Sequence, residues 1–175
     1  MTEKTLLGLS ECPNMPKSEI PIGTAEFRNV MGHFGTGVVV IAALAHNLPV
    51  GMTCQSFMSV SLDPPLVCFC PSHASKSWPL IREANQFSVN VLALDQQSIC
   101  EDFAKSGGDK FLNVEWTRSM CDNPLISGSI AHIDCDIVEV HAAGDHDIVI
   151  GLVRDLQLIR PSAPLLFYQG QFTSL

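Results

Sequence analysis

The first half of the chain alternates apolar runs with turn-forming residues, a pattern typical of short strands. The run at 38–43 is rich in β-branched side chains, which favour strands. The turn at 46–49 then predicts a hairpin. Asp63-Pro64-Pro65 predicts a loop, because proline cannot donate to a strand ladder. The strands predicted in this half are 38–43, 50–58, 66–70 and 86–92.

Apolar residues at helical spacing predict three short helices, and the rest of the second half is mostly strand. Phe27, Val30, Met31 and Phe34 fall on one face of the first helix, and Pro79 suits the first turn of the second. Gly144-Asp145 predicts a turn between two strands. The predicted helices are 24–34, 78–84 and 95–104, and the later strands are 129–142, 147–154, 155–160 and 165–172.

These elements predict a mainly β protein with short peripheral helices. Seven or eight strands joined by hairpins favour an antiparallel barrel over a Rossmann fold, which needs regular βαβ crossovers. Residues 1–23 carry three prolines and few apolar pairs, so we expect an N-terminal arm. Residues 24–175 then form a single domain, which is the usual organisation at this length.

Charge and composition narrow the possible partners. Ten basic against eighteen acidic residues give a net charge of −8, which disfavours binding to nucleic acid or to an anionic membrane. Charged residues make up only 16% of the chain, so we expect an oligomer that hides more surface than one chain can. No apolar run is long enough to predict a transmembrane helix.

The cysteines and the N-terminus predict a cytoplasmic protein. Seven cysteines without a CxxC pair, an odd number, fit reduced thiols. Residues 1–7 lack the long apolar run of a signal peptide.

Three kinds of chemistry find little support in the sequence. No histidine pair has the i, i+4 spacing of a helical zinc site, so we predict no metal. A Ser–His–Asp hydrolase is left open by spacing alone, although the chain has no G-x-S-x-G motif. Gly35-Thr36-Gly37 is too short for a dinucleotide fingerprint and precedes a strand, so it indicates the end of a helix.

Two polar segments are better candidates for ligand binding. Ser75-Lys76-Ser77-Trp78 places hydroxyls and an ammonium at a predicted helix start, where backbone N–H groups favour a phosphate. A polar loop with a capping serine is the alternative. The stretch 53–57 carries small polar groups at a strand edge, which suits the polar rim of a heteroaromatic ring or, equally, a half-exposed strand.

Seven segments in this order resemble the flavin reductase family, whose fold is the FMN-binding split barrel. The resemblance covers residues 24–172 and is closest to the short reductase components of two-component, flavin-dependent monooxygenases acting on phenolic compounds. The segments are 34–38, 51–57, 59–67, 75–78, 87–92, 144–146 and 164–170.

The resemblance implies a homodimer that binds FMN or FAD near the subunit interface and uses NADH. NADPH is the less favoured donor, because no arginine cluster is visible for its additional phosphate. The residues implied around the flavin ring are Thr36, Gly37, Val38, Val39, Thr53, Cys54, Gln55, Ser56 and Phe57, with Ser61 and Leu62 beside it. Those implied at the flavin phosphate are Ser75, Lys76 and Trp78, and those at the nicotinamide are Gly144, Asp145 and His146, with Tyr168 returning near the site.

The implied activity is that of an NAD(P)H:flavin oxidoreductase. A hydride moves from nicotinamide C4 to flavin N5 while the protein stacks the two rings and keeps water away. His146 is the implied catalytic residue, positioning the nicotinamide, and a separate oxygenase receives the reduced flavin. The alternatives are a flavin-binding electron carrier without a nicotinamide site and a relative of pyridoxamine-phosphate oxidases. The Gly144-Asp145-His146 match favours the reductase, and the ten basic residues argue against the oxidase.

Overall fold

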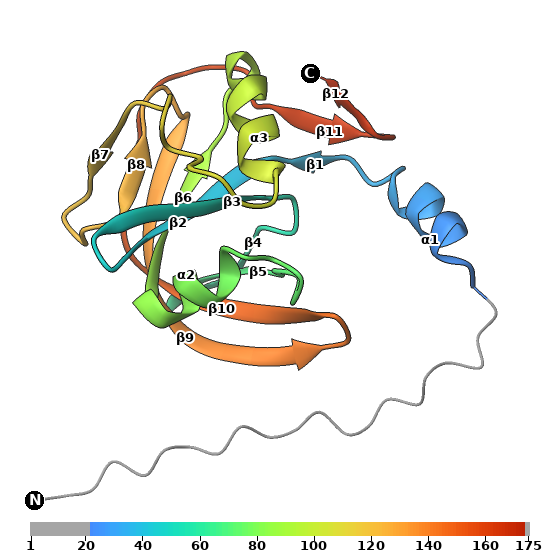
Figure 1. The fold of residues 1–175 in the computed structure, drawn as a ribbon, viewed down its shortest axis with the longest axis horizontal. Helices are drawn as coiled ribbons and strands as arrows, with labels where there is room; N and C mark the ends of the chain where they lie inside the picture. Colours follow the sequence, from blue (N-terminus) through green and yellow to red (C-terminus); the bar gives the residue numbers. More distant parts are fainter. Residues whose placement is uncertain (1–21, 174–175) are drawn as a thin grey trace, which may run out of the picture.

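The computed structural model describes residues 22–173 (Figure 1), so nearly all of the arm predicted for residues 1–23 lies outside the described residues. The helices are α1 (Thr24–Met31), α2 (Trp78–Ala84), the 3₁₀ helix η1 (Leu94–Gln96) and α3 (Gln97–Ala104). The strands are β1 (Thr36–Gly37), β2 (Val39–Ala45), β3 (Leu48–Cys54), β4 (Met58–Leu62), β5 (Pro65–Phe69), β6 (Gln86–Val91), β7 (Trp116–Arg118), β8 (Pro124–Ile126), β9 (Ala131–Ala143), β10 (His146–Leu158), β11 (Leu166–Tyr168) and β12 (Gln171–Thr173).

Seven of these strands form one sheet in the order β3-β2-β6-β9-β10-β5-β4, and every neighbouring pair is antiparallel. Two smaller sheets, β1-β11-β12 and β7-β8, lie beside it (Figure 1). The prediction of a mainly β, antiparallel fold with short peripheral helices is therefore confirmed.

Strand β2 is buried on both faces, which explains its unbroken apolar run. Val39 and Ile41 pack into one core cluster, whereas Val40 and Ala42 pack into a second. This is the two-residue alternation of an extended strand with a core on each side. Strand β2 therefore forms the partition between the two clusters.

The sheet is rolled, because strands that are not neighbours share the first cluster. Val39 of β2 packs in the same cluster as Phe69 of β5, which lies four places away in the strand order. The second cluster places Cys100 and Phe103 of α3 against the outer face of β2. The result is the split barrel that the sequence predicted.

Helix α1 projects from this body beyond β1 (Figure 1). Its apolar face is largely exposed, with Val30 63% and the following Phe34 71% accessible. The helix ends at Met31, three residues before the predicted end.

Several strand boundaries differ from the prediction. The strand predicted over 50–58 ends at Cys54, and a new strand, β4, starts at Met58. The last residue of the loop predicted at 63–65, Pro65, is instead the first residue of β5, a position where proline is tolerated.

The C-terminal half contains two further differences. The strands predicted at 147–154 and 155–160 are one strand, β10, whose register shifts between Val153 and Asp155 and interrupts the alternation. The strand predicted at 165–172 is a hairpin, because Gln169 and Gly170 have φ of 50° and 78° and form a tight turn.

Gly151→Ala is expected to destabilise the fold. A Cβ at Gly151 would lie 2.6 Å from Cζ of Phe87 and 3.2 Å from Cβ of Cys135. The Phe87 ring is fully buried and lies 5.1 Å from that of Phe69, so it has no room to move away. Overpacking of this kind costs roughly 1–3 kcal/mol, which urea unfolding would measure.

Gly23→Ala is the matched control, because a Cβ at Gly23 meets nothing within 4 Å. We expect its effect to stay below about 0.5 kcal/mol. Equal stability of the Gly151→Ala variant and the wild type would contradict the tight packing between β10 and β6.

Candidate functional site

A groove with a volume of about 940 Å³ opens along the barrel. Its walls come from the end of β3 and the turn after it, the loop after β5, the C-terminal end of α3 and the start of β10. Residues far apart in the sequence thus meet around one space. The predicted site residues among its lining are Thr53, Cys54, Gln55, Ser56, Ser75, Lys76 and His146.

Neutral polar groups at the end of β3 are held firmly in place. The Thr53 hydroxyl donates to the Cys100 carbonyl at 2.7 Å, which ties β3 to α3. The Ser56 hydroxyl accepts from the Cys70 amide at 2.8 Å and lies 3.2 Å from Cys54 Sγ. Burial raises the pKa of the Cys54 thiol, so this side chain stays neutral. This end of the groove therefore presents a rigid, uncharged rim.

Lys76 stands on the loop before α2 with its side chain exposed. Within residues 22–173 it forms no ion pair. The neighbouring Ser75 hydroxyl accepts from the Trp78 amide at 3.2 Å, which fixes the loop. The groove therefore has an uncompensated positive charge on this loop.

Trp78, predicted at the flavin phosphate, has its side chain turned into the core, and its role at a phosphate stays a prediction. Its side chain is 3% exposed and packs in the first core cluster, where the indole N–H donates to Asp147 Oδ2 at 2.7 Å. Its backbone N–H is taken by Ser75. Helix α2 has only seven residues, so its start adds little as an anion site.

His146 reaches the groove from a tight turn at the start of β10. Gly144 has φ of +67°, a conformation that glycine adopts without strain, and it closes the turn between β9 and β10. His146 Nδ1 lies 2.7 Å from Asp145 Oδ1, and this hydrogen bond lowers the pKa of the Asp145 carboxyl. The bond orients the ring, so the other ring nitrogen is left for a ligand.

Asp147, which the sequence analysis did not single out, joins the two sides of this site. Its Oδ1 lies 2.9 Å from His73 Nε2, its Oδ2 accepts from Trp78, and Arg82 Nη1 is 3.9 Å away. Burial disfavours the charged carboxylate, but the hydrogen bonds from His73 and Trp78 more than offset it and hold the pKa of Asp147 below its ordinary value. The signal available in the sequence was its position directly after the Gly-Asp-His motif.

Lys110 is a second lysine of the groove that the sequence analysis missed. It follows the glycine-containing stretch 106–109 and is half-buried, with its ammonium 2.9 Å from the Phe103 carbonyl. Only the fold brings this residue back to the groove, so no local motif revealed it.

The remaining predicted residues lie outside the lining of the groove. Gly37, Val38, Val39 and Phe57 line a separate apolar cavity of about 160 Å³. Thr36 lies beside them in the sequence, and its buried hydroxyl makes no hydrogen bond within the described part of the chain. Their roles stay predictions.

Three further predicted positions are also outside it. Ser61 and Leu62 lie on the edge strand β4, where Leu62 is 93% exposed. Tyr168 lies on β11 with its ring edge-on to His33 at 6.2 Å. These roles also stay predictions.

Residues 22–173 contain neither a metal-binding cluster nor a membrane-spanning helix. No three His, Cys, Asp or Glu side chains in that range gather in a way that could hold a metal ion. No helix in the same range is long and apolar enough to cross a membrane.

Comparisons with known proteins identify the class. The family model described as "Flavin reductase like domain" matches residues 31–175. The reductase subunit HsaB of a flavin-dependent monooxygenase from Rhodococcus jostii is 47% identical over 88% of this chain and 79% of its own. The FMN reductase (NADH) SmoA from Agrobacterium fabrum is 37% identical over 93% of this chain and 94% of its own.

A solved structure agrees with the sequence relatives. The NADH:FAD oxidoreductase SgcE6 of Streptomyces globisporus, in complex with NAD and FAD fragments, is 35% identical, with a TM-score of 0.81 over 85% of this chain and 90% of that chain. The chain belongs to the flavin reductase-like family, and the family prediction is confirmed.

The residues around the groove fit a flavin. Met52 offers apolar surface for a face of a flat ring, and the rim at the end of β3 offers neutral polar groups for its edge. Lys76 offers the charge that a phosphate needs.

Asp147→Asn is expected to lower stability at neutral pH by roughly 1–3 kcal/mol, because it removes charge-assisted hydrogen bonds from a buried site. The pKa of Asp147 is lowered in the folded state, so its contribution is present above the ordinary value of 3.8 and is lost as pH falls through the folded pKa. Urea unfolding should therefore show a difference between wild type and variant that shrinks below pH 3.8. A difference independent of pH would contradict a role for the charge.

Proposed function

We propose that this chain is an NAD(P)H-dependent flavin reductase that passes reduced flavin to a separate oxygenase. The observation that carries the proposal is the single groove that brings together the rim of β3, Lys76 and His146. The names of the relatives support it: two are an FMN reductase using NADH and a reductase subunit of a flavin-dependent monooxygenase. The flavin is FMN or FAD, and NADH is the favoured donor.

Each part of the groove has a distinct role in this activity. A bound flavin supplies the acceptor for a hydride from the reduced nicotinamide. Lys76 and Ser75 hold the flavin phosphate, and Thr53 and Gln55 face the polar edge of the ring. His146 positions the nicotinamide, and the apolar walls exclude water, so the protein contributes orientation more than acid–base chemistry.

We further propose a homodimer whose interface includes helix α1. Phe27, Val30 and Met31 on this helix and Phe34 just after it are exposed in the single chain, and Phe27 and Met31 also line the groove. A second chain covering this face would close the site on that side. Light scattering should give twice the 19.0 kDa of one chain, and the mass of a monomer at micromolar concentration would overturn the proposal.

The free thiols support a reducing compartment. The six cysteines of residues 22–173 are all unpaired, and we place the protein in the cytoplasm on that ground.

The activity is tested by following NADH oxidation with FMN, with FAD and with no added flavin. We expect oxidation that depends on flavin and is faster with NADH than with NADPH. Flavin binding without any NADH oxidation would favour the alternative, an electron carrier without a nicotinamide site.

His146→Ala is expected to slow flavin reduction by roughly ten- to a hundred-fold, because a positioning contact to the nicotinamide is lost. Flavin affinity should change by less than about two-fold, since the phosphate and rim contacts remain. Single-turnover flavin bleaching at saturating NADH measures the rate. His141→Ala is the matched control, because His141 is exposed on β9 and bonds to Glu139, outside the groove. An unchanged bleaching rate in His146→Ala would remove His146 from the site.

A further inference from the structure

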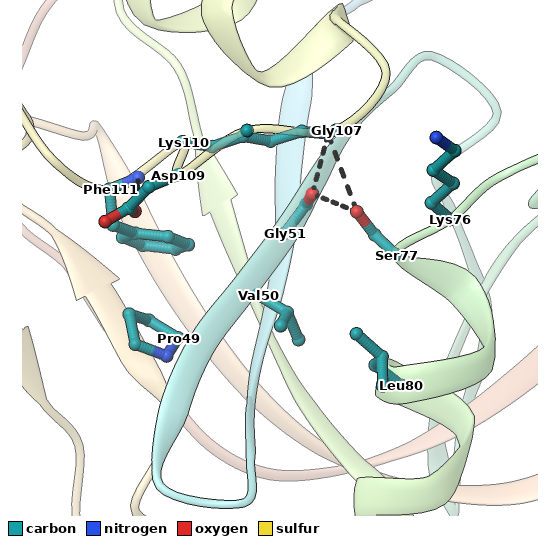
Figure 2. A pocket seen from close by; sticks show the side chains of 11 residues that line it. Pro49, Val50, Gly51, Lys76, Ser77, Leu80, Gly107, Asp109, Lys110 and Phe111 are labelled. Carbon is teal, nitrogen blue, oxygen red and sulfur yellow. Dashed lines mark hydrogen bonds between the residues drawn. The ribbon is translucent and has the colours of Figure 1, made fainter.

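A smaller pocket of about 180 Å³ lies beside the groove (Figure 2). The two spaces share lining residues, so a ligand in the groove can extend into the pocket. The shared residues are Lys76, Ser77, Gly107 and Lys110. Figure 2 shows the two lysines arriving from different elements, Lys76 from the loop before α2 and Lys110 from the loop after α3.

Among the described residues, only neutral groups bind the ammonium of Lys110. It donates to the carbonyls of Phe103 at 2.9 Å and Gly51 at 3.1 Å, and its third contact, to the Ser77 hydroxyl, is long at 3.5 Å. No carboxylate within residues 22–173 pairs with the Lys110 ammonium. Burial lowers the pKa of Lys110, because its charged form is less well solvated there. A half-buried cation without a counter-ion is costly, and a ligand anion near the weak third contact would remove that cost.

The nearby acids do not neutralise the pocket. The Asp109 carboxylate accepts from the Phe111 amide at 3.0 Å, and Figure 2 shows it beside Phe111, away from Lys76. Asp102 is paired with Lys105 at 2.6 Å. Lys76 and Lys110 therefore outnumber Asp109, the one carboxylate among the lining residues, and the pocket keeps a net positive charge for a ligand.

Between these two lysines the pocket is lined by two glycines, which have no side chains to obstruct it. Gly107 and Gly108 have φ of +80° and +76°, which side chains rarely adopt. A Cβ at Gly107 would already lie 4.0 Å from Lys76 Nζ, so a larger side chain there would crowd the lysine.

We propose that this pocket is a second phosphate site, so that the protein takes a flavin dinucleotide, FAD, in preference to FMN. The inference rests on the proposed flavin reductase function and names its substrate. Lys76 binds the phosphate next to the flavin, and Lys110 binds the second phosphate, which FMN lacks. The adenosine then lies toward Pro49 and Leu80, at the apolar side of the pocket.

The test is a set of equilibrium titrations with riboflavin, FMN and FAD, followed by flavin fluorescence. Lys110→Met should weaken FAD binding by about ten-fold and FMN binding by less than about two-fold, because only FAD loses a charge-assisted contact. Lys76→Met should weaken FMN and FAD binding alike, also by about ten-fold. Neither variant should affect riboflavin, which has no phosphate.

Arg118→Met is the matched control, since it removes one positive charge on β7, outside the pocket. It should leave the preference for FAD over FMN unchanged. Equal losses of riboflavin, FMN and FAD in Lys110→Met would show that Lys110 only holds the loop, which overturns the proposal.

Two further measurements cover the other outcomes. NADH also carries a diphosphate, so a raised KM for NADH in Lys110→Met, with the FAD preference intact, would assign the site to NADH and overturn the proposal.

If the Lys110→Met variant does not fold, flavin binding by the wild type tests the proposal instead. Its FAD binding should be tighter than its FMN binding and fall more steeply with salt, and equal affinities and slopes would overturn the proposal. Failure of the proposed function is distinct, because it would appear as no NADH oxidation by the wild type with either flavin.

Discussion

The geometry of the groove depends on the buried carboxylate of Asp147. Its two oxygens bind His73 from the loop after β5 and Trp78 from the start of α2, while its own backbone starts β10. Backbone bonds reinforce the link, with the His73 amide donating to the Asp145 carbonyl at 2.9 Å and the Asp147 amide to the Pro71 carbonyl at 3.0 Å. The loop that carries Lys76 and the turn that carries His146 are thus held as one unit. Without this charge, only the backbone hydrogen bonds would hold the two segments together.

The double burial of β2 has a related consequence for the site. Because β2 has a core on each face, β3 beside it is fixed against α3 on one side and against the barrel interior on the other. The Thr53 hydroxyl completes this arrangement by bonding the Cys100 carbonyl in α3. Rigid elements hold polar groups more accurately than loops do, which matters when a flat ring must be bound at its edge.

The sequence predicts what depends on local pattern and misses what depends on distant contacts. The strand at β2 and the helix at α2 follow from apolar runs and a proline at a helix start, and the structure confirms both. The burial of the Trp78 side chain was not predicted, because a tryptophan near a polar loop has no local signal for burial, and only the distant Asp147 shows why its indole turns inward. Lys110 was missed for the same reason, since its three acceptors come from three separate segments of the chain.

An acidic protein that binds an acidic ligand needs its charges arranged locally. The chain carries a net charge of −8, yet the part of the groove near Lys76 and Lys110 is positive, because the two lysines outnumber Asp109 there and Asp102 is paired with Lys105. Interactions between exposed charges fade beyond about 8 Å at physiological ionic strength, so the acidic residues elsewhere contribute little at this distance. The electrostatic attraction on a phosphate in the groove therefore comes mainly from the two nearby lysines and not from the net charge of the whole molecule. The excess of acid keeps other anionic surfaces away, and the same protein can be selective for small phosphorylated ligands without attracting nucleic acid.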